Sequence, residues 1–170
     1  MKKSKKFFSD GSDAVSCCCY RDFPIGRLYL TAGKEALKGV YFTLPEEGVR
    51  WEHSPILELA VCWLDKYFQN IPVSPFTLPL APQGTVFQHK VWDILLQIPY
   101  GKTMTYGEIA KMISPEMSPR AVGNAVGANP IPIIIPCHRV IARNGPGGYS
   151  GGSLAQKRQL LAVEKIILPF

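Results

Sequence analysis

Three prolines constrain the fold of the most apolar stretch of this chain. Pro130, Pro132 and Pro136 surround the run Ile133-Ile134-Ile135. Proline lacks an amide donor and fixes φ, so a regular helix cannot continue through residues 130–136. We therefore expect residues 133–135 to form a buried, extended segment.

A thiol, an imidazole and a guanidinium follow this segment at Cys137, His138 and Arg139. A basic neighbour lowers the pKa of a cysteine toward the nucleophilic thiolate. Adjacent residues do not face each other on a helix, and they point to opposite faces of a strand, so no direct contact between the thiol and the imidazole is expected. Activation would instead run through a bridging water, with another group fixing the imidazole. The alternative is a structural cysteine beside a satisfied histidine.

A pair of helices is indicated just upstream. Residues 105–113 begin with a threonine suited to cap a helix, and residues 119–128 form the second segment of the pair. A short connection, residues 114–118, joins them. This layout is that of a helix-turn-helix, whose second helix carries mostly small side chains.

The segment from Arg120 to Ile141 resembles the signature of the O6-alkylguanine-DNA alkyltransferases, because it contains Pro-Cys-His-Arg-Val at residues 136–140. These proteins repair DNA by moving an alkyl group from the O6 atom of guanine onto their own cysteine. The resemblance is strong over residues 87–164. The residues that fall at the family spacing are Tyr106, Arg120, Asn129, Pro132, Cys137, His138 and Val140.

The resemblance implies a catalytic set of four residues. Cys137 would attack the alkyl carbon by in-line displacement, and His138 with Glu164 would maintain its thiolate. Glu164 ends the family's Leu-Leu-x-x-Glu pattern and would orient the imidazole. Tyr106 would protonate the departing base. The implied activity is a single-turnover methylated-DNA–protein-cysteine methyltransferase that needs no cofactor and no metal.

The resemblance also implies surfaces for DNA and for the damaged base. Arg120 would fill the gap left by a flipped nucleotide, and the small residues after it suit the minor groove better than base-edge readout in the major groove. The expected DNA contacts are Arg120, Ala121, Gly123, Asn124 and Ala125. The expected substrate pocket comprises Asn129 as a hinge, Pro132, Val140, Tyr149 as a lid and Ser150 as a hydrogen-bond donor to O6.

Two other classes of protein stay open from the residues alone. An alkylated-DNA-binding protein without transferase activity would keep the helix-turn-helix and Arg120, although Cys137 argues against it. A cysteine hydrolase would turn over repeatedly and would need no DNA. Intact-mass measurement after incubation with methylated DNA separates these classes, since only the transferase keeps one alkyl group.

The pattern predicts an α/β (α+β) protein of two domains. Residues 1–81 should form a small β-sheet with one helix and a basic tail, with strand-like alternation at 27–31 and 37–43 and helical periodicity at 55–69. Prolines and a glycine between residues 72 and 84 mark the connection. Residues 82–170 should form a mostly helical DNA-binding and alkyl-acceptor domain containing the helix-turn-helix.

Charge and cysteine usage fit a DNA-binding protein in a reducing compartment. The net charge is +6, and residues 81–170 hold nine Lys and Arg against four Asp and Glu, a balance that favours a polyanion partner. The five cysteines are odd in number and have no zinc-finger spacing. No apolar run reaches the length of a membrane span. We expect a monomer in the cytoplasm, or in the nucleus of a eukaryote, whose partner is double-stranded DNA containing O6-alkylguanine.

Overall fold

The computed structural model describes residues 16–44, 49–52 and 54–167. The chain divides into two compact units, residues 1–83 and residues 84–170. The predicted basic tail lies outside the described residues. Within the described ranges, no helix is both long enough and apolar enough to cross a membrane. The predicted α+β class is confirmed.

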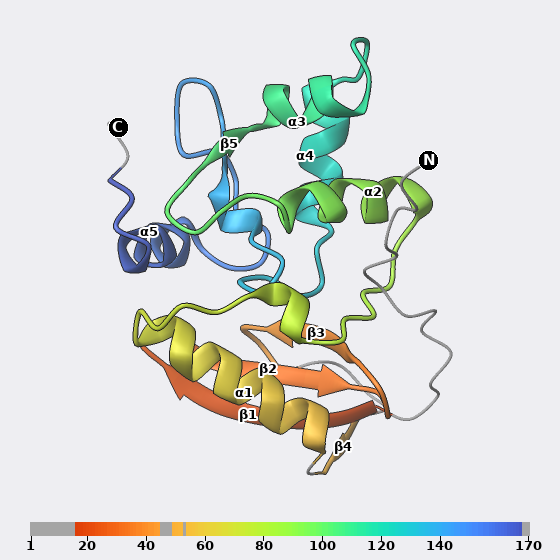
Figure 1. Ribbon diagram of the computed structural model, residues 1–170, viewed down its shortest axis with the longest axis vertical. Helices are drawn as coiled ribbons and strands as arrows, with labels where there is room; N and C mark the ends of the chain where they lie inside the picture. The colour runs from red at the N-terminus through yellow and green to blue at the C-terminus, as the bar shows by residue number, and fades with distance from the viewer. Residues whose placement is uncertain (1–15, 45–48, 53, 168–170) are drawn as a thin grey trace. The chain divides into compact units, whose positions relative to one another are not determined.

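A four-stranded sheet forms the first unit, in the order β3-β2-β1-β4 (Figure 1). β1 (Ser16–Phe23), β2 (Gly26–Ala32) and β3 (Leu37–Tyr41) are antiparallel neighbours, and β4 (Val49–Trp51) runs parallel to β1. The two strands predicted from alternation are confirmed as β2 and β3. β1 and β4 were not predicted, since the three consecutive cysteines in β1 do not alternate with polar residues.

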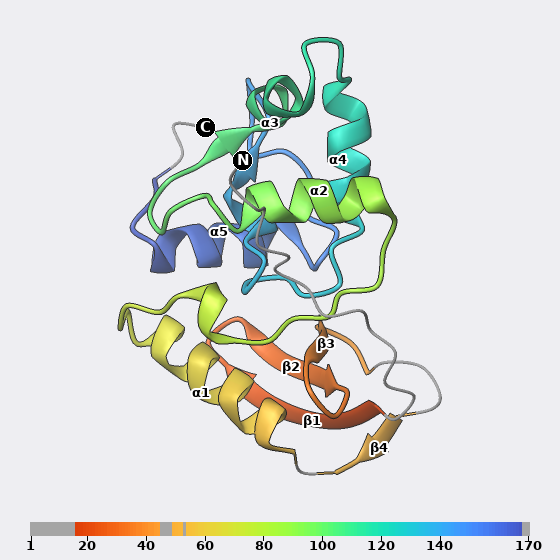
Figure 2. The same cartoon turned by 45° about the vertical axis from the view of Figure 1, so that its right-hand side comes forward.

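One helix, α1 (Pro55–Phe68), covers a face of this sheet (Figures 1 and 2). Ser54 caps it by accepting a hydrogen bond from the amide of Leu57, and Pro55 occupies the first turn, where no amide donor is needed. The helix packs against β1 and β2. The buried residues of the helix are Leu57, Ala60, Trp63, Leu64 and Tyr67. A short 3-10 helix, η1 (Pro75–Thr77), follows.

The second unit is mostly helical, as predicted. Its helices are α2 (Val86–Leu95), α3 (Tyr106–Ile113), α4 (Pro119–Gly127) and α5 (Leu154–Val163). Two short parallel strands, β5 (Met104–Thr105) and β6 (Val140–Ile141), hold the segment before α3 beside the segment that follows Cys137. The one-turn 3-10 helix η2 (Cys137–Arg139) leads directly into β6.

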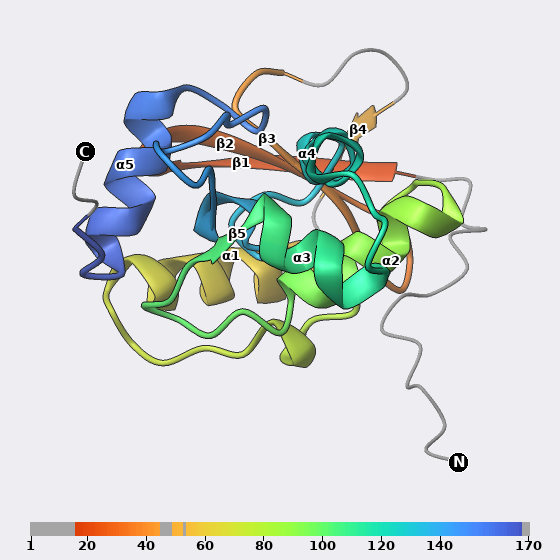
Figure 3. The same ribbon diagram turned by 90° about the horizontal axis from the view of Figure 1, so that it is seen from above.

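The helix-turn-helix consists of α3 and α4, which pack against each other; Figure 3 views α4 nearly along its axis. Thr105 caps α3 in a reciprocal pair with Glu108, as the sequence indicated, and Ser118 caps α4. Trp92 of α2 is fully buried and donates its indole N–H to the carbonyl of Ala125, 2.9 Å away. α2 therefore supports the inner face of α4.

The expected extended segment at residues 133–135 is instead a tight turn, so that expectation was wrong. Ile133 has φ of 76°, and Pro132 bridges to Ile135. The side chain of Asn129 holds the turn, accepting from the amide of Ile131 at 3.0 Å and donating to the carbonyl of Ile135 at 2.8 Å. A β-branched residue at positive φ is strained. The predicted burial is confirmed, because Ile133 and Ile135 are 0% exposed.

Candidate active site around Cys137

Cys137 is the first residue of η2 and is only 4% exposed. It lines a cavity of about 340 Å³ between the helix-turn-helix and the loop that precedes α5. Two glycines on consecutive turns of α4 leave room for this cavity on the helix surface. The lining residues are Tyr106, Gly123, Val126, Gly127, Cys137, Gly148, Tyr149 and Ser150.

Burial raises the pKa of Cys137 to about 11. The side chain of Asn129, the positive charge of Lys157 and the backbone amides of Cys137 and His138 act in the opposite direction but do not overcome burial. The expectation that a basic neighbour would bring the thiol toward the thiolate is therefore wrong for this state. At neutral pH Cys137 is a thiol, and it needs a base before it can attack.

The imidazole of His138 contacts Glu164, although 26 residues separate them in the chain. Its Nε2 atom lies 2.7 Å from Oε1 of Glu164, and both side chains are 0% exposed. Glu164 is the residue that ends α5, where the helix dipole disfavours a carboxylate. The contact needed for the predicted orienting role is present; the role itself stays a prediction.

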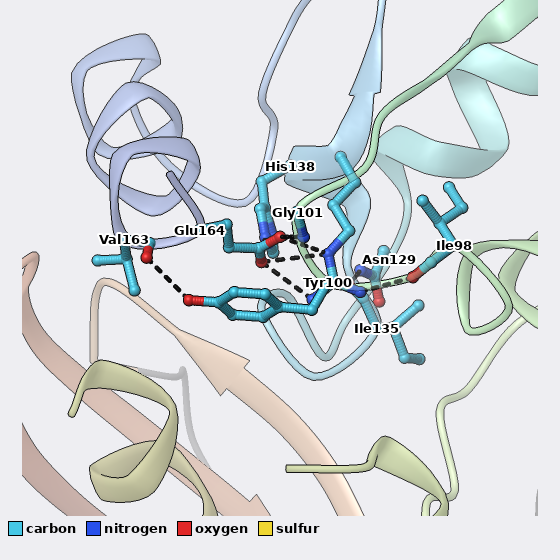
Figure 4. Close-up of polar contacts among 9 residues, drawn as sticks. Ile98, Tyr100, Gly101, Asn129, Ile135, His138, Val163 and Glu164 are labelled. Carbon is cyan, nitrogen blue, oxygen red and sulfur yellow. Dashed lines mark hydrogen bonds and ion pairs between the residues drawn. The ribbon is translucent and has the colours of Figure 1, made fainter. Parts of the chain in front are cut away.

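Figure 4 shows Glu164 in contact with His138 and Gly101. Arg139 supplies the cation that makes this buried carboxylate tolerable. Its Nε atom donates to both oxygens of Glu164 at 2.9 and 3.1 Å, and one terminal nitrogen donates to Oε1 at 3.0 Å. Its other terminal nitrogen donates to the carbonyl of Ile98 at 2.7 Å. The backbone amide of Gly101 also donates to Oε2 of Glu164, at 3.0 Å. No role for Arg139 was predicted from the sequence.

These charges set the protonation of the imidazole. Burial alone would raise the pKa of Glu164, but hydrogen bonds from His138 and Arg139 and the charge of Arg139 lower it to about 2. Burial lowers the pKa of His138, and the charge of Arg139 adds to this, against the opposing effect of Glu164. His138 is therefore neutral at pH 7. Because an ionised carboxylate can only accept, the proton sits on Nε2 and leaves Nδ1 as the basic nitrogen.

Two tyrosines contribute phenol groups to the cavity. Tyr106, the first residue of α3, is half-buried, and burial together with the charge of Cys137 raises its pKa. Tyr149 is 9% exposed, and burial raises its pKa well above the ordinary value. Both phenols therefore keep their protons at neutral pH, as a proton donor must.

The other predicted pocket residues divide into two groups. Ser150 lines the cavity, but its hydroxyl donates to the carbonyl of Gly127. Asn129, Pro132 and Val140 are buried and do not line the cavity. Asn129 instead connects α4 to the tight turn, which agrees with the position expected of a hinge.

The predicted DNA-contacting residues lie on more than one face of α4. Arg120 and Asn124 are exposed, while Ala121 and Gly123 are half-buried. Ala125 is only 3% exposed because it faces α2. The side chain of Ala125 is therefore too buried to contact DNA, and its prediction as a DNA-contacting residue was wrong.

Metal ligation finds no support in the described part of the chain. Within those residues there is no group of three or more His, Cys, Asp or Glu side chains arranged to hold a metal ion. None of the five cysteines, all of which lie among the described residues, takes part in a disulfide bond.

A buried cysteine that lines a cavity bounded by a helix-turn-helix is the arrangement expected of a DNA-binding protein with a reactive thiol. Residues 86–166 match the family described as "6-O-methylguanine DNA methyltransferase, DNA binding domain". The chain is 44% identical over 147 residues to the methylated-DNA–protein-cysteine methyltransferase of Methanosarcina acetivorans, covering 83% of this chain and 93% of that protein. It is 37% identical over 152 residues to the protein of the same name from Haemophilus influenzae, covering 86% and 85%.

Solved structures show the same fold. The OGT of Mycobacterium tuberculosis in complex with DNA matches with a TM-score of 0.77 and 41% identity, covering 88% of this chain and 93% of that one. The O6-methylguanine methyltransferase of the same organism matches with a TM-score of 0.76 and 38% identity, covering 89% and 92%. This chain belongs to the methylated-DNA–protein-cysteine methyltransferase family.

Replacing Arg139, the cation of the buried cluster, should lower the free energy of unfolding by an amount that depends on pH. Above the ordinary carboxyl pKa of 4.5, ionised Glu164 stabilises the wild type, and this contribution is lost as pH falls toward its folded-state pKa of about 2. Arg139→Met leaves a buried carboxylate without its permanent cation, which should cost about 3–5 kcal/mol at pH 7. The loss should shrink at pH 4, where His138 of the variant is protonated and pairs with Glu164.

Urea unfolding at the two pH values measures this difference. Arg143→Met, at an exposed position on the loop after β6, is the matched control and should change little at either pH. An equal loss at pH 7 and pH 4 for Arg139→Met would show that Arg139 contributes packing rather than charge.

Proposed function

We propose that Cys137 accepts the alkyl group directly from O6-alkylguanine in double-stranded DNA. One observation carries this proposal: the thiol lines a cavity that also holds the phenol of Tyr106 and is bounded by α4 of the helix-turn-helix. Membership of the methylated-DNA–protein-cysteine methyltransferase family supports it. The protein is thus a DNA-repair transferase, and its own cysteine is the acceptor.

The proposed chemistry is one displacement with a balanced movement of protons. The thiol of Cys137 passes its proton through a water to Nδ1 of His138, and the thiolate attacks the alkyl carbon. The new bond joins sulfur to carbon, while the bond from carbon to O6 breaks. Tyr106 gives its proton to the departing guanine, which leaves neutral, and the proton held by His138 restores the phenol. The product thioether has no easy reverse reaction, so each molecule acts once.

We propose that α4 carries the DNA-binding surface. Arg120 is exposed at its first turn, and the cavity opens between Gly123 and Gly127 on the same helix. Small residues let the helix approach a minor groove closely, and an arginine beside the cavity can occupy the space of an extruded nucleotide. The relative solved with DNA supports this assignment. On this proposal, residues 82–170 contain both DNA-binding and acceptor functions.

The remaining assignments follow from the chemistry required. Cys137 must stay reduced to act, so we propose a reducing compartment, the cytoplasm or the nucleus of a eukaryote. Ser150 is proposed to turn its hydroxyl from Gly127 toward O6 when the base enters, and Tyr149 to close over the base. A single copy of the chain supplies every side chain in this scheme, so we propose a monomer.

Cys137→Ser should abolish transfer yet keep binding to methylated duplex DNA, because the exposed surface of α4 is unchanged. Intact-mass measurement after incubation with DNA containing O6-methylguanine should show a gain of one methyl group in the wild type and none in the variant. Cys62→Ser, at an exposed position on α1, is the matched control and should react like the wild type. A methyl group found on Cys62 or on residues 17–19 would overturn the assignment.

Arg120→Ala should slow the extrusion of the nucleotide from the duplex and leave alkyl transfer to Cys137 unchanged. Reaction with methylated duplex DNA should slow by at least about tenfold, since unstacking a nucleotide costs a few kcal/mol that Arg120 would partly offset. Reaction with the free base O6-benzylguanine should stay within about twofold of wild type. Lys66→Ala, which removes an exposed cation from α1, controls for net charge. Equal slowing on both substrates would mean that Arg120 is not involved in extrusion.

A further inference from the structure

The two edges of the sheet in the first unit differ in how they are covered. At the β3 edge, Leu37 bridges to Leu80, and the amide of Ala81 donates to the carbonyl of Leu37 at 2.8 Å. The opposite edge belongs to β1, where β4 pairs with residues 16–18 and lies beside one end of the strand (Figure 2). Among the described residues, none pairs with the outer edge of residues 19–23. An open strand edge is a template for a further strand.

The last hydrogen bond from the β4 side shows which backbone groups of β1 point outward. The amide of Glu52 donates to the carbonyl of Cys18 at 3.3 Å, so the backbone groups of Cys18 face this edge. In an antiparallel ladder the N–H and C=O groups alternate in direction from residue to residue. Those of Tyr20 and Asp22 therefore face outward as well, while those of the residues between them face β2. Tyr20 and Asp22 thus offer donors and acceptors to an incoming strand.

A largely apolar cavity of about 510 Å³ lies along the same edge, because residues 18–21 of β1 line it. Trp51, which is 57% exposed, closes one end, and Leu57 and Val61 of α1 form an aliphatic wall. Burial raises the pKa of Cys19 to about 11, so the side chain of Cys19 is a neutral thiol. A strand added to β1 would direct every second side chain toward this wall.

Carboxylates border the cavity. Glu52 and Glu58 line it, and both are exposed. Arg21 also lines it, but its guanidinium donates to both carboxylate oxygens of Asp65, at 3.3 and 3.4 Å. The charge of Arg21 is therefore matched within the first unit, and the two glutamates make the border acidic. In a chain of net charge +6 this local excess of carboxylates favours a cationic partner.

We propose that the outer edge of β1 at residues 19–23 binds an extended segment of a partner protein, which adds a strand to the sheet. The segment carries aliphatic side chains at alternate positions, which enter the cavity, and lysine or arginine at its ends, which meet Glu52 and Glu58. Hydrogen bonds to the backbone of Tyr20 and Asp22 supply affinity, and the cavity supplies selectivity. The proposal concerns the first unit alone and does not depend on the chemistry of Cys137.

The probe is the dye-labelled peptide acetyl-Lys-Thr-Val-Thr-Val-Thr-Lys-amide, and its control carries glutamate in place of both lysines. Binding to the full chain is measured by fluorescence anisotropy, and hydrogen exchange of single amides by NMR. Saturating lysine peptide should slow exchange of the Tyr20 and Asp22 amides by at least about tenfold, since both become hydrogen-bonded. The glutamate peptide should bind at least about fivefold more weakly because of the acidic border.

Variants of the edge and of its acidic border test the two contributions separately. Tyr20→Pro removes an outward N–H where an edge strand tolerates proline, and should weaken binding by at least about fivefold. Tyr20→Ala removes the same ring but keeps the N–H, so binding should stay within about twofold of wild type. Glu58→Lys should weaken binding by at least about fivefold, whereas Glu35→Lys, an exposed control between β2 and β3, should change it by less than about twofold.

Unchanged exchange at Tyr20 and Asp22 in the wild type, or equal binding by Tyr20→Pro and Tyr20→Ala, would overturn the proposal. If circular dichroism shows that Tyr20→Pro does not fold, wild-type exchange and Glu58→Lys decide. Two other occupants are outcomes that also overturn it. Self-association in sedimentation experiments that is weakened by Glu58→Lys would assign the edge to a second copy. Protection of the Tyr20 amide without peptide, lost when residues 1–15 are deleted, would assign it to the chain's own segment.

Discussion

The buried carboxylate of Glu164 organises the second unit. It ends α5, and Arg139, His138 and the amide of Gly101 all donate to it from segments distant in the chain. Tyr100 adds a further connection by donating its hydroxyl to the carbonyl of Val163 at 2.8 Å. A single ionised group thus joins the segment before β5, the one-turn helix that carries Cys137 and the end of α5. Removing Glu164 would leave the charge of Arg139 buried and unmatched.

The environment of Cys137 and the Glu164 cluster together account for a thiol of low reactivity in the resting protein. Burial keeps Cys137 protonated, so the thiol is protected from indiscriminate alkylation until a base removes its proton. Arg139 already neutralises Glu164, which leaves His138 uncharged and able to act as that base. Had Glu164 lacked Arg139, its charge would favour an imidazolium that could not accept a proton. On the proposed mechanism, Arg139 therefore contributes to reactivity through the protonation state of His138.

The helices could be predicted from the sequence because the residues that mark a helix end lie within a few positions of that end. Thr105 with Glu108, and Pro119 at the start of α4, mark helix ends that need no tertiary information. The turn at Ile133 could not be predicted in this way, since the side chain of Asn129 imposes it. Arg139 was not predicted to be functional because arginines are usually solvent-exposed, and its partner Glu164 lies 25 residues away in the sequence. The burial of Ala125 was predictable, since it lies three residues after buried Val122 on one helical face.

The protonation of His138 tests this account most directly. The chain contains three histidines, so ¹⁵N NMR of the labelled protein can assign the imidazole signals with His138→Gln as reference. At pH 7 the account predicts a neutral His138 ring with its proton on Nε2, and a shift to the imidazolium in Arg139→Met. A protonated ring in the wild type, or a proton on Nδ1, would contradict it.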